Sequence, residues 1–247
     1  MEHIIELKEV FFSTQNQDIV RGVSYQFIEG KTTALVGPSG GGKSTVLKLA
    51  AGLLVPSGGT VYFRGGDMTL MNRGENLTFR RQSAMVFQDS ALWANQSLYQ
   101  NLELPLRIHF PSMTKADREN RMQEVLAEVG YKKNLLIRPA QLSMGEQKLI
   151  AFARAMLCGP HILFLDEWTE SLDDRAAQHL IELVKRRKEQ QDTIIFVSHD
   201  FRIIKNLADY MVMILGGQVS LALTGEEISS DDQLVRHIEK GITANEI

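Results

Sequence analysis

The chain has 247 residues, of which 44% are hydrophobic and 23% are charged, and its formal net charge is −3. This length fits one large α/β domain or a core with a smaller insert, and the apolar content is sufficient for a packed core. The slightly negative charge argues against broad nucleic-acid binding, the single cysteine, Cys158, excludes an internal disulfide, and no apolar run approaches the ~20 residues of a membrane-spanning helix.

The first part of the chain has a β pattern. Runs rich in β-branched and aromatic side chains alternate with polar or glycine-containing turns, and the first two runs predict an antiparallel pair. A polar connection that carries Arg73, Arg80 and Arg81 precedes the last run, which ends at Gln88. The predicted strands are residues 4–12, 20–27, 32–36, 60–63 and 84–87.

A glycine-rich segment between the third of these strands and an apolar helix matches G-x-x-x-x-G-K-[ST], the phosphate-binding loop of nucleotide hydrolases. Its glycines let successive backbone N–H groups surround a phosphate, and the helix that begins near Lys43 adds the positive end of its dipole. The Lys43 ammonium can reach the β- and γ-phosphates, and the Ser44 hydroxyl can ligate Mg²⁺. The predicted nucleotide site is formed by Gly37, Pro38, Ser39, Gly40, Gly41, Gly42, Lys43, Ser44 and Thr45.

Residues 89–159 have a helical pattern, and β-prone runs resume after them. Ser143 and Glu146 have the spacing of a capping box at the start of an apolar helix over residues 147–157, and residues 174–190 predict a further helix. The predicted strands of this part are residues 162–165, 193–197, 211–215 and 219–223.

Two carboxylates follow a continuous apolar run that is typical of a strand buried on both faces. Asp166, where this strand ends, can hold Mg²⁺ beside the phosphates, and Glu167 can polarise a water for attack on the γ-phosphate. His199 follows another apolar strand. A lone histidine at such a place is usually without a role, but the carboxyl ends of parallel strands share the edge where ligands bind, which makes His199 a candidate contact for the γ-phosphate or the water.

These residues together resemble the nucleotide-binding subunit of ABC (ATP-binding cassette) transporters, from about residue 4 to about residue 223. The phosphate loop is followed in family order by five further motifs. They are Gln88 as the Q-loop glutamine, residues 142–147 as the signature, residues 162–167 as the Walker B strand, residues 171–173 as the D-loop and His199 as the switch histidine.

The resemblance implies an α/β fold, with a P-loop NTPase core that has a mixed sheet, an N-terminal antiparallel β subdomain and an inserted α-helical subdomain. Residues 1–88 and 160–224 are the predicted ATP-binding core, residues 89–159 the helical subdomain and residues 225–247 a C-terminal helical tail.

The resemblance also implies a homodimer that binds two ATP molecules with Mg²⁺ and hydrolyses them. Ser143 and Gly145 of one subunit would close over the ATP held by the phosphate loop of the other, and Asp173 would contact the nucleotide. The catalytic residues implied are Glu167, His199 and Gln88, and the Mg²⁺ ligands are Ser44, Gln88 and Asp166.

Three departures from the family pattern concern this site. Met144 and Glu146 replace residues of the usual signature L-S-G-G-Q, and Trp168 stands where the family usually has proline. The aromatic side chain that stacks on adenine is usually found near Thr14, and Phe12, two residues earlier, is the substitute that the sequence offers.

The segment after Gln88 stands where the family receives the coupling helices of a membrane permease. Its pattern F-Q-x-x-A-L-[aromatic], followed by N-x-x-x-P-L-R, resembles ATPases of the Mla/Mce group, which move phospholipids between bacterial membranes. The tail at residues 234–241 resembles the C-terminal helix of the same group. We therefore expect a cytoplasmic protein, peripheral on the inner face of the membrane through a permease, with a possible substrate-binding subunit and without nucleic acid.

Two other interpretations stay open at this point. A cassette ATPase of the lipoprotein-release or cell-division type shares the stretches at residues 80–82 and 87–89, and the division type acts as a signalling partner rather than a transporter. An unrelated P-loop enzyme such as a small-molecule kinase is disfavoured by the signature helix and by the strand before His199.

Overall fold

The computed structural model describes residues 2–15, 17–230 and 238. Internal contacts divide the chain into two compact units, Met1–Asn76 with Lys188–Ile247, and Leu77–Arg187. The first unit contains the phosphate loop and His199, whereas the second contains Gln88, the signature and the carboxylates Asp166 and Glu167. The predicted boundaries at residues 88 and 160 stay predictions.

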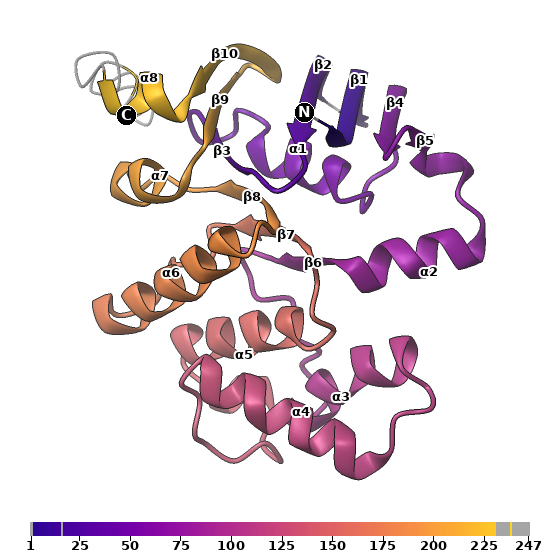
Figure 1. Cartoon of the computed structure of the whole chain (residues 1–247), viewed down its shortest axis with the longest axis vertical. Helices are drawn as coiled ribbons and strands as arrows, with labels where there is room; N and C mark the ends of the chain where they lie inside the picture. Colours follow the sequence, from indigo (N-terminus) through magenta and orange to yellow (C-terminus); the bar gives the residue numbers. More distant parts are fainter. Residues whose placement is uncertain (1, 16, 231–237, 239–247) are drawn as a thin grey trace. The chain divides into compact units, whose positions relative to one another are not determined.

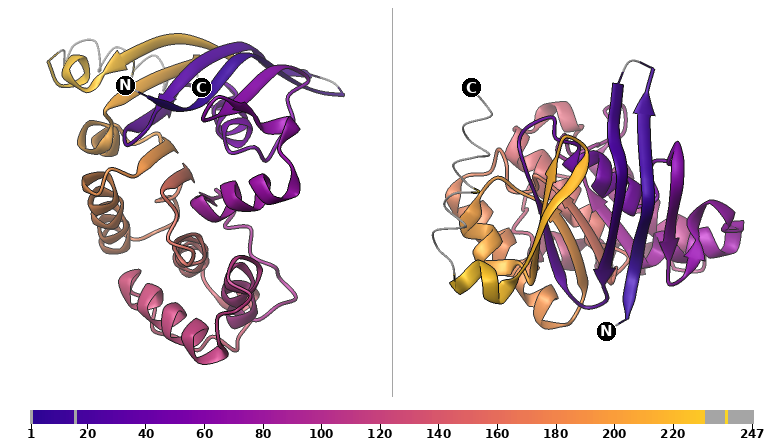
Figure 2. Two further views of the ribbon diagram at one scale, coloured as in Figure 1. Left: turned by 45° about the vertical axis from the view of Figure 1, so that its right-hand side comes forward. Right: turned by 90° about the horizontal axis from the view of Figure 1, so that it is seen from above.

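The first unit contains an antiparallel β subdomain and a set of strands of mixed direction. The antiparallel sheet has the order β2-β1-β4-β5, and Figures 1 and 2 show its two long strands running side by side. Its strands are β1 (His3–Thr14), β2 (Gln17–Ile28), β4 (Gly58–Phe63) and β5 (Gly66–Asp67). In the order β10-β9-β3-β8, β3 is parallel to both neighbours and β10 is antiparallel to β9. These strands are β3 (Thr32–Val36), β8 (Thr193–Val197), β9 (Tyr210–Leu215) and β10 (Gln218–Thr224).

Burial explains the uninterrupted apolar runs of the sequence. Every residue of β3 and β8 is buried, which is expected of parallel strands covered on both faces. The helices that lie wholly within this unit are α1 (Lys43–Ala50), α7 (Phe201–Leu207) and α8 (Gly225–Ser230), and Met68–Leu70 forms the 3₁₀ turn η1. Helix α8 lies at the start of the predicted tail, residues 225–247, and the rest of that tail, except Ile238, lies outside the described residues. The helix predicted from the resemblance at residues 234–241 therefore stays a prediction.

The second unit is mainly helical and contains one parallel strand pair. Its strands are β6 (Ser83–Val86) and β7 (Ile162–Asp166). Its helices are α3 (Leu98–His109), α4 (Lys115–Glu128), α5 (Met144–Met156) and most of α6 (Asp174–Glu189), with Pro139–Gln141 forming the 3₁₀ turn η2. Helices α3, α4 and α5 pack on one another, and α5 also packs on β6 (Figure 1). The predicted capping box of Ser143 and Glu146 is confirmed at the start of α5.

The polar connection predicted before β6 is wrong in part, because it contains the helix α2 (Arg73–Gln82). Only Phe79 of this helix is buried, so the sequence lacks the apolar stripe that reveals most helices. The signal that could have shown it is Asn72 followed by Glu75. At the helix start, the Asn72 side chain accepts hydrogen bonds from the N–H groups of Gly74 and Glu75. The Glu75 carboxylate in turn accepts one from the N–H group of Asn72.

The mixed strands, the antiparallel β subdomain and the helices agree with the predicted α/β architecture. Within the described ranges, no helix has both the length and the apolar character needed to cross a membrane.

Candidate active site

The phosphate loop connects β3 to α1 in the first unit, and close backbone contacts fix its shape. Gly37 has a φ of +145°, and a Cβ atom there would lie 2.1 Å from the carbonyl oxygen of Ile214 on β9. Gly42 has a φ of +98°, and a Cβ atom would lie 2.9 Å from the carbonyl oxygen of Ile19 on β2. Any larger side chain would overlap these oxygens, so both positions require glycine.

Lys43 lies inside this loop. Its Nζ donates hydrogen bonds to the carbonyl oxygens of Gly37 and Pro38, at 2.8 and 2.9 Å, and the residue is only 6% exposed. The helix α1 begins at Lys43, so the positive end of its dipole is at the loop. A buried ammonium, a helix start and glycine N–H groups together suit a polyphosphate anion.

His199 leaves the sheet at the same edge as the loop. Strands β3 and β8 are parallel with Leu35 opposite Val197, so the residues that follow them, Gly37 and His199, lie at their shared carboxyl end. The His199 side chain is exposed. The structure thus brings together two of the predicted functional elements within this unit.

The two phenylalanines of β1 differ in surroundings. The Phe11 ring covers two glycines of the same sheet, since a Cβ atom at Gly22 or Gly58 would lie 3.1 or 3.5 Å from it. Phe12 is half-buried and has no such packing role among the described contacts. Its stacking on adenine stays a prediction.

A second edge, within the second unit, brings Gln88 to the carboxylates. Strand β6 is parallel to β7 with Val86 opposite Leu165, so Gln88 and Asp166 are at the same end of the pair. The Nε2 group of Gln88 donates to a carboxylate oxygen of Glu170 at 3.1 Å, which leaves the amide oxygen as the atom that can ligate a cation. Asp166 is 1% exposed at the end of a fully buried strand.

Glu167 has a left-handed backbone, with a φ of +42°. A residue with a branched or long side chain in this region costs about 1–3 kcal/mol and needs support from its surroundings. The next residue, Trp168, is completely buried and packs against Phe152 of α5, with ring centroids 6.1 Å apart. The tryptophan that departs from the family pattern therefore anchors the backbone beside Glu167 in the core.

The signature segment forms the start of α5. The Ser143 hydroxyl accepts a hydrogen bond from the N–H group of Glu146, and the Glu146 carboxylate accepts one from the N–H group of Ser143. The same carboxylate pairs with Lys133. The contact with Lys133 and the hydrogen bond from the Ser143 N–H group lower the pKa of Glu146. The glutamate that departs from the usual signature is thus used to cap its own helix.

Gly145 lies against the predicted D-loop. A Cβ atom at Gly145 would be 2.8 Å from the carbonyl oxygen of Ser171, so the glycine is required by packing within the chain. The Asp173 carboxylate accepts a hydrogen bond from the N–H group of Ala176 at the start of α6. Its predicted contact with nucleotide stays a prediction, as do those of Ser143 and Gly145.

Two cations on α5, Lys148 and Arg154, were not among the residues predicted to have a function. Lys148 is 2% exposed, and burial lowers the pKa of its ammonium, while the nearby carboxylates of Glu170, Asp166, Asp89 and Glu167 oppose that effect. A basic residue in the middle of an apolar helix was the available signal, because a buried charge must have partners.

The donor chemistry of the predicted cation ligands fits Mg²⁺, since Ser44, Asp166 and Gln88 offer hydroxyl, carboxylate and amide oxygens. Across the described part of the chain, no three His, Cys, Asp or Glu side chains are grouped so that they could hold a metal by themselves. Mg²⁺ in nucleotide sites usually takes few protein ligands together with phosphate oxygens and water, which agrees with this small set.

The phosphate loop, the signature helix and the carboxylates after β7 are the parts of a nucleotide-hydrolysing cassette. The model of the ABC transporter family matches residues 20–170, and the chain belongs to this family. The predicted resemblance to ABC transporter ATPases and the P-loop NTPase fold are confirmed, whereas the finer resemblance to the Mla/Mce group stays a prediction. The protein is an ATPase that binds ATP and couples its hydrolysis to transport.

Two curated relatives have cargoes in their names. The nickel import ATP-binding protein NikE of Escherichia coli (strain K12) is 33% identical over 233 residues, which are 92% of this chain and 87% of the relative. The methionine import ATP-binding protein MetN 1 of Pseudomonas putida is 34% identical over 192 residues, 77% of this chain and 57% of the relative.

Solved structures agree in fold. A dimeric bacterial ABC transporter cassette, MJ0796, has a TM-score of 0.82 at 27% identity, and covers 90% of this chain and 99% of its own. The same cassette has been solved as a dimer in a post-hydrolysis state bound to ADP and Pi, with a TM-score of 0.82, 26% identity and the same coverage.

Proposed function

We propose that this chain works as a dimer around two ATP molecules and Mg²⁺ on the cytoplasmic face of a membrane, where it powers a permease. The observation that carries the proposal is the phosphate loop, in which Lys43 is buried and held at 2.8–2.9 Å by two loop carbonyls. The dimeric state of the similar cassette MJ0796 supports a shared site between two copies.

The proposed reaction begins with the binding of the phosphates by the glycine loop and by the Lys43 ammonium. Ser44, Asp166 and Gln88 would hold Mg²⁺, which when bound neutralises phosphate charge. Glu167 accepts a proton from the attacking water, and His199 contacts the γ-phosphate or orients that water. Ser143 and Gly145 of the second copy complete the site with a hydroxyl and a helix N-terminus.

We expect Lys43→Ala to weaken ATP binding by about 10- to 100-fold, because it removes a charge-assisted contact worth ~1.5–3 kcal/mol. Titration of a fluorescent ATP analogue measures the effect, and Lys48→Ala, which lies on the same helix α1, is the matched control. Unchanged affinity of the Lys43→Ala protein would place the nucleotide elsewhere.

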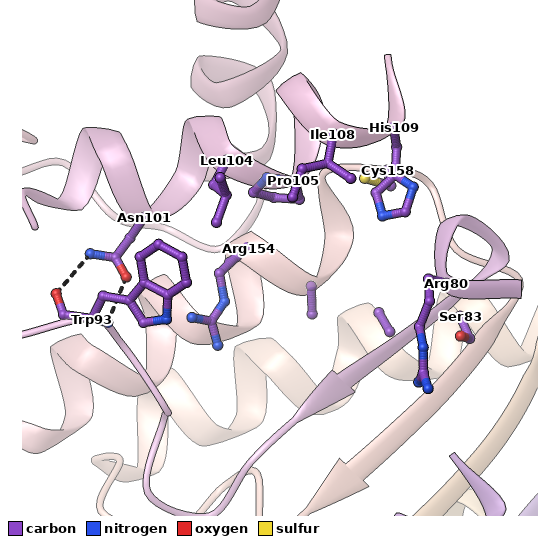
Figure 3. Close-up of a pocket in the computed structure, with 12 residues that line it drawn as sticks. Arg80, Ser83, Trp93, Asn101, Leu104, Pro105, Ile108, His109, Arg154 and Cys158 are labelled. Atoms are coloured by element: carbon purple, nitrogen blue, oxygen red, sulfur yellow. Dashed lines mark hydrogen bonds between the residues drawn. The ribbon is translucent and has the colours of Figure 1, made fainter. Parts of the chain in front are cut away.

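We propose that the permease binds at a groove in the second unit (Figure 3). Its volume is about 280 Å³, and its apolar wall includes Trp93, Leu104, Pro105 and Ile108. The Asn101 side chain accepts a hydrogen bond from the Trp93 N–H group at 2.8 Å and donates to the Trp93 carbonyl oxygen at 3.2 Å. The two halves of the pattern after Gln88 therefore meet at one wall. A groove of this size suits a few apolar side chains presented by a helix of a membrane subunit.

The cargo that we propose is phospholipid. This proposal is supported by the pattern of the segment after Gln88, which resembles the Mla/Mce group. Trp93 and Pro105 belong to this pattern, and both line the groove. The names of the curated relatives favour a second candidate, the import of a small solute such as nickel or methionine with a substrate-binding subunit. A third is the lipoprotein-release or cell-division type.

Purification of the tagged chain from its own membranes in mild detergent tests partner and cargo. We expect a permease and a lipid-binding subunit, and the complex should move a fluorescent phospholipid between vesicles only with ATP. Uptake of Ni²⁺ or methionine instead would establish that the chain powers the import of a small solute. Recovery of a cell-wall-hydrolase regulator would establish that it belongs to the cell-division type.

The groove is tested by Trp93→Asp, which places a charge on the apolar wall and should prevent recovery of the permease. The matched control is Leu136→Asp, since Leu136 is an exposed apolar side chain, 76% exposed, of the same unit outside the groove. Equal recovery with both variants would show that the permease binds elsewhere.

A further inference from the structure

The helix α5 carries a buried cation that the proposed reaction does not use. Lys148 is 2% exposed, and its Nζ donates hydrogen bonds to the carbonyl oxygens of Gln88 at 2.5 Å, Phe87 at 3.2 Å and Glu167 at 3.4 Å. These acceptors match the three donors of an ammonium group. Since a buried charge is costly without partners, the three contacts fix the position of the lysine and of the carbonyls together.

The carbonyls belong to two segments that leave the sheet side by side. Phe87 and Gln88 follow β6, and Glu167 follows its parallel neighbour β7. The backbone of Glu167 is in the left-handed region, where an ordinary residue persists only if its surroundings hold it. Its carbonyl oxygen accepts hydrogen bonds from Lys148 and from the N–H group of Glu170. Lys148 is therefore one of the groups that maintain the turn at Glu167.

A second cation of α5 holds the continuation of the first segment. Arg154 donates to the carbonyl oxygens of Ser90 at 3.1 Å and Ala91 at 2.7 Å, and both of these residues also have a positive φ. The helix thus holds four backbone carbonyls between residues 87 and 91. These hydrogen bonds of Arg154 go to the first segment, whereas those of Lys148 go to backbone carbonyls of both segments.

We propose that Lys148 is a positioning residue for ATP hydrolysis, which holds the backbones of Gln88 and Glu167 on the signature helix and so aims the Glu167 carboxylate. The signature residue Ser143 is the N-cap of this helix, about 1.4 turns before Lys148, so one rigid element carries both. The inference rests on the proposed role of Glu167 as the base.

The first test is the ATPase activity of the full chain with Lys148→Met, which has a similar length and no donor. A misplaced base should lower kcat by roughly 10- to 100-fold, whereas the KM for ATP should stay within about threefold because the phosphate loop is intact. Lys148→Arg keeps a charged donor and should restore most of the activity. Lys115→Met, at an exposed lysine of α4 in the same unit, is the control for the loss of a lysine.

Because Lys148→Met leaves three carbonyl oxygens without this donor, Lys148→Gln is measured alongside, and the thermal midpoint is recorded for each variant. The amide of glutamine keeps two donors, so its kcat should lie between those of the methionine and arginine variants. Activity in Lys148→Met equal to the wild type, or equal loss in the methionine and arginine variants, would overturn the proposal.

A double-mutant cycle separates positioning of Glu167 from general support of the fold. In a Glu167→Gln background the base is already absent, so Lys148→Met should lower the residual rate by less than about threefold. A loss as large as in the wild-type background would assign Lys148 a purely structural role. Wild-type turnover by Glu167→Gln alone would instead overturn the role of Glu167, on which the inference rests.

Discussion

Glu167→Gln should lower ATP turnover by roughly 10²–10⁴, the usual contribution of general-base catalysis. Glutamine has the same length as glutamate, so the buried strand before it and the anchoring of Trp168 against Phe152 stay in place. Asp166 also stays, so the predicted Mg²⁺ site should persist, and ATP binding should be close to that of the wild type. The measurements are steady-state phosphate release and titration with a fluorescent ATP analogue.

The same variant should reveal the dimer. ATP that binds without being hydrolysed keeps the two subunits closed, because a ligand shifts a two-state equilibrium toward the state that it binds better. Size-exclusion chromatography should then show a larger particle with ATP than without it. Glu124→Gln, at an exposed glutamate of α4, is the matched control. Turnover close to that of the wild type would mean that another residue positions the water.

The phosphate loop could be predicted from the sequence because its shape is a local property. The positive φ of Gly37 and Gly42 and the close approach of Ile214 and Ile19 all require glycine, and glycine leaves a readable pattern. The buried strands β3, β7 and β8 were predicted for a similar reason, since strands covered on both faces must be continuously apolar.

The remaining features depend on contacts between residues far apart in the chain. A lysine such as Lys148 is usually exposed, and only the fold shows that carbonyls after β6 and β7 meet its ammonium. Trp168 departs from the family pattern, and its place against Phe152 becomes visible only when α5 is packed. Glu146 departs from it as well, and its partner Lys133 lies thirteen residues away in a connection without regular structure.

The cargo is still harder to predict from this sequence, because it depends on a partner subunit. In the proposed complex, the groove beside Trp93 and Pro105 receives the permease, and the permease in turn selects what is moved. ATPases that share this cassette are named for nickel and for methionine import. The chemistry of the phosphate loop is therefore common to different cargoes, and the segment after Gln88 is where this chain can differ from them.

The second large effect is expected from Ser143→Arg, which should abolish hydrolysis and spare ATP binding to the isolated chain. In the proposed dimer, Ser143 contacts the ATP held by the phosphate loop of the other subunit, so a bulky cation there blocks closure. The serine also caps α5, and loss of such a cap costs about 1 kcal/mol. Thr114→Arg, which removes the cap of α4, is the matched control and should retain full ATPase activity.

Mixing two inactive proteins, Ser143→Arg and Lys43→Ala, gives the decisive measurement. In a mixed dimer one site carries both defects, while the other combines the intact phosphate loop of the Ser143→Arg chain with the intact signature of the Lys43→Ala chain. If one sound site turns over alone, mixing should restore up to about half of the activity per mixed dimer, because one of its two sites is intact. The two defects share the other site, where together they cost little more than either one alone. Full activity of the Ser143→Arg protein by itself would show that the signature of one copy does not serve the nucleotide of the other.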